Sequence, residues 1–433
     1  MVNSRPSMPA TPPSRPVGVL QLLALGLNGI VGVGIFFVPA AVAASAPGLG
    51  TVAVFIGTGL ALLPAAAAFA TLGARFDEDG GPVVFARAAF GDRVSFLVGW
   101  VAYVSAFFST SAVVVGLTGA VAPALGLEGT LSRRLAAVGL VTGLALVVAS
   151  GVRLSARVWT VLTVLKLLPL LLLLAAFAVA RGALPAPAPI TPEAAWLRAG
   201  LTVMFAYQGF EIVPVIAGQV RSSARAVPRA TLGSLLLAIA LYVGLALACV
   251  RTLPALASSP APLADAAGVL GGAALARLVK WGTSLSALGI AFGMLVTTPR
   301  YLSALAAGQR RLGGLDRVSP AGVPLRALAV TWALVSAIVS LGELAELFAL
   351  SSIAVLMQYG VSAAALAALA GRRRLGLRPR DAWPALPTLA VAAALVAFGA
   401  TAREALVAAA TVLVGLGLLR LAPPRAGGTA RAA

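Results

Sequence analysis

Long apolar runs separated by short polar connections make up most of this chain. A helix needs roughly 20 apolar residues to cross the hydrocarbon core of a bilayer, which is about 30 Å thick. Twelve runs are long enough or nearly so, and we expect each to be a transmembrane helix. They span residues 17–45, 50–74, 94–123, 132–151, 155–180, 196–219, 230–250, 273–306, 325–341, 346–370, 384–402 and 405–421. The pattern predicts an all-α integral membrane protein with twelve transmembrane helices.

Composition supports a membrane protein and excludes several functions. Of the 433 residues, 60% are hydrophobic and only 10% are charged, against about 25% charged in soluble proteins. The net charge of +19 comes from basic residues scattered through the connections, so we expect no nucleic-acid partner. The chain has no histidine, and its single cysteine is Cys249, which excludes disulfides, Cys/His metal sites and a histidine relay. We therefore expect no enzyme activity, metal or cofactor.

The distribution of basic residues predicts the orientation of the chain in the membrane. With the N-terminus inside, 23 Lys and Arg residues fall on cytoplasmic segments or span ends and 8 on external ones. The positive-inside rule then places both termini in the cytoplasm. Residues 1–16 contain five prolines and no apolar segment, so we expect a disordered tail instead of a signal peptide. Residues 422–433 form a second predicted cytoplasmic tail.

Two of the predicted spans contain helix-breaking residues. The first reads LGLNGIVGVGIFFVPA (25–40), and each glycine there weakens a helix by roughly 1 kcal/mol. The sixth reads VMFAYQGFEIVPVIAG (203–218), with Gly209, the acidic Glu211 and Pro214. Breaks at matching positions of two halves are typical of inverted-repeat secondary transporters, whose substrate binds where the breaks meet. Glycines that serve only close helix packing are the alternative.

The breaks divide the chain into two repeats and an addition. Residues 17–180 would form the first five-helix repeat and 195–370 the second, and 384–421 would add two further helices. The fifth span contains a lysine, Lys166, which lies about 16 Å deep if the helix enters the membrane near Ser155. Burying a lysine there costs at least about 2.5 kcal/mol, so we expect its side chain to face the protein interior or a watery cavity.

Four strings resemble signatures of the amino acid permeases of the amino acid-polyamine-organocation (APC) superfamily, in the same order along the chain. They are NGIVGVGIFFVPA (28–40), DGGPVVFARAAFGDRVSFLVGW (79–100), FAYQGFEIVPVIAGQVRSSARAVPRA (205–230) and TPRYLSALAAGQRRLGGLDRVSPAGVPLRA (298–327). The resemblance implies a LeuT-like 5+5 inverted repeat with broken first and sixth helices. It also implies alternating-access transport of an amino acid across a cell membrane, expected to be a bacterial inner membrane.

The two breaks predict complementary halves of an amino acid site. Unpaired backbone amides and the start of the following half-helix would bind the substrate carboxylate in the first break. Free carbonyls in the break of the sixth span would attract the amino group of the substrate. By resemblance, these carbonyls belong to Phe205, Ala206 and Tyr207. Phe205 also resembles the family's aromatic lid, with ordinary packing as the alternative. The predicted site comprises Val31, Gly32, Val33, Gly34, Phe205, Ala206, Tyr207 and Gln208.

Lys166 and Glu211 are the candidate proton carriers. Lys166 matches a fifth-helix lysine of proton-coupled family members, and an amine moved between wet and dry surroundings can release its proton near neutral pH. This favours H⁺ symport. The alternative is a charged strut between the first and eighth helices, as in a proton-independent exchanger of amino acids or polyamines. Glu211 would either carry protons or accept hydrogen bonds that hold the first helix in its broken shape.

The charged residues inside the spans also indicate which class of substrate to expect. Glu211 is the only acidic residue clearly inside a span, so we expect a neutral amino acid, small or apolar, in preference to arginine or diamines. The expected partners are therefore an amino acid, protons and the lipid bilayer. A scaffold or membrane enzyme that kept the fold without transport is the alternative of another class. A scaffold would not need two broken helices, and an enzyme would need a nucleophile or metal group that the chain does not show.

Overall fold

The structure is a computed structural model, and it describes residues 18–76, 80–127, 129–151, 156–180, 182–191, 194–215, 223–307, 312 and 314–421. The predicted cytoplasmic tails, 1–16 and 422–433, lie outside these ranges. Within them the chain forms helices and no strands, as the apolar runs predict. Each predicted run contains helix, so the positions of the apolar segments and of the helices agree.

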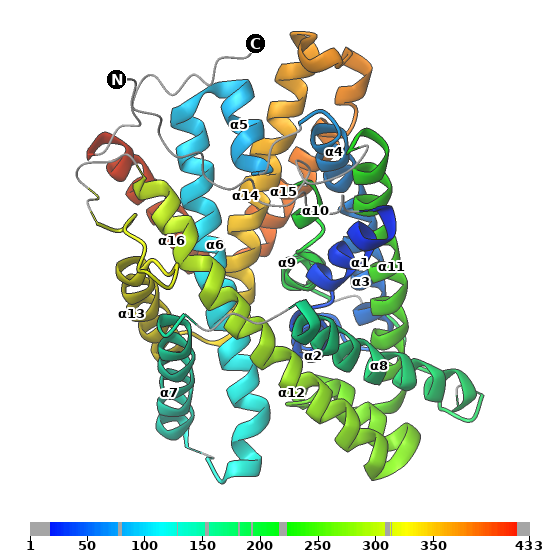
Figure 1. The fold of residues 1–433 in the computed structure, drawn as a ribbon. Coiled ribbons are helices and arrows are strands. Elements are labelled where there is room, and N and C mark those ends of the chain that lie inside the picture. The colour runs from blue at the N-terminus through cyan, green and yellow to red at the C-terminus, as the bar shows by residue number, and fades with distance from the viewer. Residues whose placement is uncertain are drawn as a thin grey trace, which may run out of the picture.

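The helices follow one another along the chain as Figure 1 shows. The main ones are α1 (Val19–Ile30), α2 (Gly34–Ala43), α3 (Leu49–Ala61), α4 (Leu63–Gly73), α5 (Pro82–Phe90), α6 (Asp92–Val121), α7 (Thr130–Ala149), α8 (Ala156–Ala180), α9 (Trp196–Tyr207), α10 (Ile212–Val215), α11 (Ser223–Thr252), α12 (Pro262–Ala306), α13 (Leu325–Leu341), α14 (Leu344–Gly371), α15 (Ala385–Gly399) and α16 (Ala402–Leu421). Short 3₁₀ turns occur between some of them. By length and hydropathy, eight helices in the described ranges can cross a membrane, or nine if the bent pair α1–α2 counts as one span. The total of twelve spans stays a prediction.

Both helix breaks lie where the glycine patterns predict them. The first predicted span divides into α1 and α2, which are bent by 44° across residues 31–33. The sixth divides into α9 and α10 across residues 208–211, with Gly209 at a φ of +124°. A third break, at Gly272, divides α12 one residue before the predicted start of the eighth span. The short helix α5 was not predicted as a separate element.

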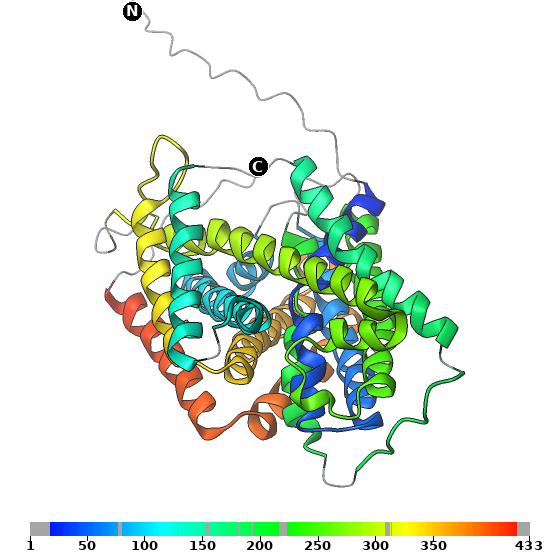
Figure 2. The same cartoon turned by 90° about the horizontal axis from the view of Figure 1, so that it is seen from below.

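The long helices α6 and α14 pack against each other through the middle of the molecule, and α12 crosses α6 (Figure 1). α1 packs on α11, which in turn packs on α3 and α4. In the view from below, α7 and α13 lie side by side at one edge and α8 lies towards the other (Figure 2). Most of the interior is one large apolar core, beside two smaller buried clusters, and it contains edge-to-face aromatic pairs such as Phe69 on Tyr359 at 5.2 Å between ring centroids.

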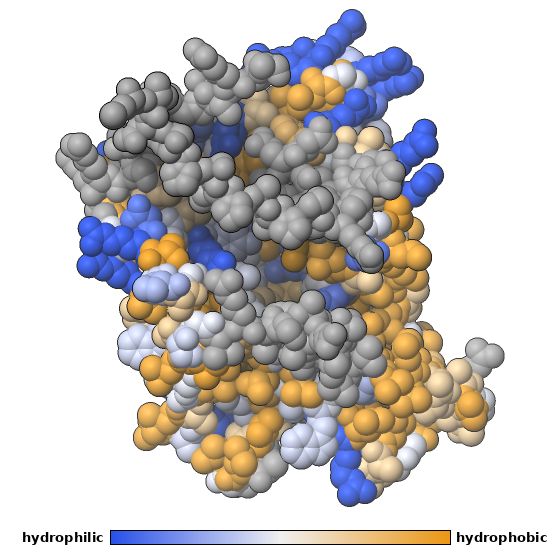
Figure 3. Space-filling view, in the orientation of Figure 1, coloured by the Kyte–Doolittle hydropathy of each residue, from blue (hydrophilic) through white to orange (hydrophobic). Residues whose placement is uncertain are grey.

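Connections that the sequence assigns to one side of the membrane contact one another. On the predicted external side, the Leu49 amide donates to Ala188 O at 2.9 Å. On the predicted cytoplasmic side, Arg75 donates to Leu375 O at 3.2 Å. Hydrophilic side chains gather at the top of Figure 3, around the connection after α14, while apolar side chains cover the lower right of the molecule. This grouping is the one that the predicted topology requires, whereas the orientation in a membrane stays a prediction.

Candidate functional site

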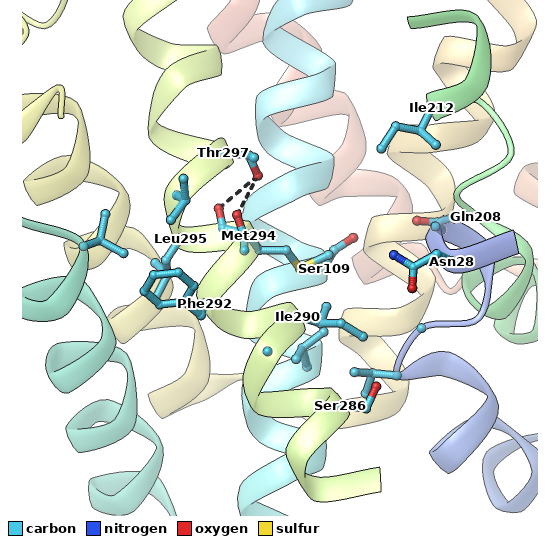
Figure 4. Close-up of a pocket in the computed structure, with 18 of the residues that line it drawn as sticks. Asn28, Ser109, Gln208, Ile212, Ser286, Ile290, Phe292, Met294, Leu295 and Thr297 are labelled. Carbon is cyan, nitrogen blue, oxygen red and sulfur yellow. Dashed lines mark hydrogen bonds between the residues drawn. The ribbon is translucent and has the colours of Figure 1, made fainter. Parts of the chain in front are cut away.

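A cavity of about 670 Å³ lies where the two helix breaks face α12 (Figure 4). Residues from both breaks line one side, and α12 residues such as Ile290 and Met294 line the other. The wall includes five of the eight residues predicted to bind substrate, together with the predicted coupling lysine. These are Gly32, Val33, Gly34, Phe205, Gln208 and Lys166. At one end the wall includes the exposed residues Thr297 and Arg300, so the cavity reaches the surface there.

The two breaks touch through glycines. A Cβ placed on Gly29 would lie 2.9 Å from Gly209 O, and one placed on Gly34 would lie 2.6 Å from the Cα of Ala206. Both distances are too short for a side chain against rigid backbone. Gly32 differs, because the nearest atom to its Cβ would be 3.6 Å away, which is ordinary contact. Glycine is therefore required at 29 and 34 for the approach of the helices, whereas position 32 has room.

The first break offers fewer free amides than the sequence predicts. The Val31 amide donates to Leu27 O at 2.8 Å and the Gly32 amide donates to Ile30 O at 2.6 Å, so both are occupied. Val31 is also fully buried and lies off the cavity wall. The Val33 amide has no acceptor among the described residues, and Gly34 begins α2, where a helix supplies no partner for its first amides. Of the amides predicted to bind the substrate carboxylate, only those of Val33 and Gly34 are left without an acceptor among the described residues.

The end of α9 contributes carbonyls and one aromatic ring. The last carbonyls of a helix lack intrahelical donors, which applies here to Phe205, Ala206 and Tyr207. The Phe205 ring lines the cavity and packs on Phe348 with 4.5 Å between ring centroids. The side chains of Ala206 and Tyr207 point elsewhere: Ala206 packs on Gly34, and the Tyr207 hydroxyl donates to Phe55 O at 3.0 Å.

Gln208 is held by a polar network that the sequence analysis missed. Its Oε1 accepts from the Ser351 hydroxyl at 3.2 Å, and its Nε2 lies 3.4 Å from Ser352 Oγ. Ser351 also shares a hydrogen bond of 2.6 Å with Ser109, which lines the cavity from α6. The available signal was the small hydroxyl residues in STSA and LSSIA, inside otherwise apolar spans. The network holds the side-chain amide of Gln208, in the second break, against α6 and α14.

Lys166 lies on the cavity wall, as its depth predicts, with only 5% of the residue exposed. Its Nζ donates to Asn28 O at 2.8 Å, in the last turn of α1. Tyr242 of α11 donates at 2.7 Å to Ile30 O, which also accepts from the Gly32 amide. Two side chains from neighbouring helices thus donate to backbone carbonyls in the last turn of α1, and both bonds hold α1 in its interrupted form.

Glu211 stabilises a different break from the one that the sequence suggested. Its Oε2 accepts from the Gly209 amide at 2.8 Å and from the Tyr359 hydroxyl at 2.7 Å. The carboxylate therefore closes the break of its own span and joins it to α14. Glu211 does not line the cavity. Among the described residues, the charged side chains on the wall are Lys166 and Arg300, both positive.

Known proteins resemble this chain over most of its length. An uncharacterized transporter of Mycobacterium tuberculosis is 29% identical over 357 residues, which cover 80% of this chain and 79% of that protein. The branched-chain amino acid permease BcaP of Bacillus subtilis is 28% identical over 390 residues, which cover 79% of this chain and 80% of that protein. A crystal structure of the Eremococcus coleocola manganese transporter shares the fold, with a TM-score of 0.61 at 14% identity over 93% of this chain and 94% of that one.

The family assignment rests on a match that covers both helix breaks, Lys166 and the whole cavity wall. Residues 17–414 match the family model described as amino acid permease. The relatives agree with that match, because they are transporters and permeases of comparable length. The all-helical fold with several apolar spans agrees as well. The chain belongs to the amino acid permeases of the APC superfamily, a family of multi-pass membrane transporters.

Proposed function

We propose that this protein is a secondary active transporter that moves a neutral amino acid across the cell membrane by alternating access. The observation that carries the proposal is the cavity between the two helix breaks. There the start of α2 brings unpaired amides to the wall, and the end of α9 brings free carbonyls near it. An α-amino acid has a carboxylate for the first and an ammonium group for the second. The protein would not change its substrate chemically.

The fold that we propose for this activity is the LeuT-like arrangement of two five-helix repeats, 17–180 and 195–370, with 384–421 added. The matching interruptions at residues 31–33 and 208–211 support it. The end of the cavity at Arg300 lies on the side that the sequence assigns to the cytoplasm. The conformation described here is then the one open to the inside of the cell, and the other state opens after α1 and α9 move.

A neutral substrate follows from the charges on the wall. Lys166 and Arg300 are positive, and no Asp or Glu of the described ranges lines the cavity. A second positive charge on the substrate would have to leave water without a compensating partner, which is unfavourable. Much of the remaining wall is apolar, with Val113, Ile290 and Met294, and this suits an aliphatic side chain. The name of the permease BcaP agrees with this class.

Proton coupling through Lys166 is the mode that we propose. A protonated amine can donate to Asn28 O at the observed 2.8 Å and so joins α8 to α1. Loss of the proton weakens this charge-assisted bond and frees the last turn of α1 to move. The protonation state would thereby be linked to the position of the broken helix. The same bond also suits a permanently charged strut in an exchanger, which is the second candidate.

The substrate class can be tested with purified protein. A ligand that binds only the folded state raises the unfolding temperature by mass action. We expect some of the twenty proteinogenic amino acids, neutral ones foremost, to raise it, and putrescine and spermidine to leave it unchanged. Absence of a shift with every amino acid would contradict the proposal. A shift with polyamines alone would replace it by the polyamine exchanger.

A further inference from the structure

One hydroxyl on the cavity wall, that of Ser286, has no hydrogen-bond partner among the described residues. Ser286 lies on α12 and lines the cavity, with 4% of the residue exposed. Its Oγ makes no hydrogen bond within the described part of the chain. Two other hydroxyls of α12 avoid this state by donating to the carbonyl one turn earlier: Thr283 donates to Val279 O at 2.7 Å and Thr297 donates to Gly293 O at 3.0 Å.

Ser286 lies level with the start of α2, because contacts on either side of it along α12 fix the register. One turn after Ser286, the Cδ1 of Ile290 lies 3.8 Å from where Gly32 would carry a Cβ. Just before it, Thr283 and Ser284 share a small pocket with Phe36 and Phe37 of α2. Ser286 falls between these contacts and shares a helix face with Ile290. In Figure 4 it lies below Ile290, next to the break.

This position brings a hydroxyl donor to amides that are already unpaired. The Val33 amide has no acceptor among the described residues, and Gly34 opens the ten-residue helix α2. The start of a helix is partly positive and favours an anion. A carboxylate has two oxygens that accept several hydrogen bonds, so amides and a hydroxyl can bind it together.

We propose that the Ser286 hydroxyl donates a hydrogen bond to the carboxylate of the amino acid substrate when that carboxylate lies against the amides of Val33 and Gly34. The inference rests on the proposed function and adds a third element, α12, to a site otherwise formed by the two breaks. A buried hydroxyl without a partner costs free energy in the empty protein. A substrate carboxylate bound beside Ser286 would remove that cost.

The variant Ser286→Ala tests this role with little risk to the fold, because it removes an unpartnered group. We expect the empty protein to melt at the same or a higher temperature than wild type. For each amino acid that wild type binds, we expect Kd in isothermal titration calorimetry to rise roughly tenfold or more, as for loss of one hydrogen bond to a charged group. The rise should be the same for every bound amino acid, since all share the carboxylate.

A matched control lies on the same helix. Thr298 is fully buried, its hydroxyl is also unpartnered, and it does not line the cavity. We expect Thr298→Val to leave every Kd unchanged. Unchanged affinities in Ser286→Ala, or a loss that varies with the substrate side chain, would overturn the assignment to the carboxylate. If wild type binds none of the twenty amino acids, the proposed function fails, and this role fails with it.

Discussion

At the scale of single residues, the two broken spans approach each other closely at some glycines, whereas another glycine of the first break leaves room for a side chain. A Cβ on Gly34 would lie 2.6 Å from the Ala206 backbone, whereas the atom nearest to a Cβ on Gly32 would be 3.6 Å away. We expect Gly34→Ala to lower stability by about 1–3 kcal/mol, as overpacking does, and to abolish amino acid binding. Gly32→Ala is the matched control and should fold normally. Thermal unfolding and calorimetric binding measure both, and equal effects at the two positions would contradict the geometry.

Glu211 gives a second prediction at this scale. Its Oε2 accepts from the Gly209 amide and the Tyr359 hydroxyl. Glu211→Gln keeps an oxygen that can accept both bonds, so we expect the fold and gradient-driven uptake to survive. Glu211→Ala leaves both donors unpaired and should cost about 1–3 kcal/mol in stability. Loss of gradient-driven uptake in a well-folded Glu211→Gln variant would assign the proton to Glu211 and remove it from Lys166.

At the scale of elements, an ion pair joins the start of α9 to the first turn of α16. Arg198 Nη1 lies 2.6 Å from Glu404 Oε2, and the Glu404 side chain is only 2% exposed. Arg198→Met leaves a buried carboxylate without its charged partner, which typically costs about 3–5 kcal/mol. The double variant Arg198→Met/Glu404→Gln should recover much of that loss in thermal unfolding.

The exposed pair Arg87–Asp92 serves as the control for this prediction. Its charged atoms are 3.8 Å apart and both side chains are more than half exposed. Exposed pairs contribute 0–1 kcal/mol, so Arg87→Met should change the unfolding temperature little. A double variant at Arg198 and Glu404 that is no more stable than Arg198→Met alone would show that the pair does not brace α9.

The sequence predicts elements better than it predicts hydrogen-bond partners, for a physical reason. Glycine and proline weaken a helix locally, so both breaks could be located from the residues around Gly32 and Gly209. The two hydrogen bonds that link Ser109, Ser351 and Gln208 join residues 242 and 143 positions apart, and only the packed fold brings these residues together. The turn that occupies the Gly32 amide depends on backbone angles that residue type does not fix.

At the scale of the whole molecule, the cavity connects two broken helices to a lysine on a third. Lys166 bonds the last turn of α1, Gln208 is fixed to α6 and α14, and Glu211 closes the second break. In the proposed mechanism, a change of protonation at Lys166 would therefore act on the broken first span, which also supplies the predicted carboxylate site. This linkage is what a symporter requires, because substrate and proton must bias the same conformational change.

Uptake into proteoliposomes measures that linkage most directly. With an amino acid that the purified protein binds, wild type should accumulate substrate under an inward proton gradient, independently of sodium, and stop on addition of a protonophore. Lys166→Ala should lose accumulation while it still binds substrate, because the amides of Val33 and Gly34 and the carbonyls of α9 remain. Lys166→Arg, which cannot release its proton, should also fail to accumulate. Gradient-driven accumulation by Lys166→Arg would contradict the role of Lys166 as the proton carrier.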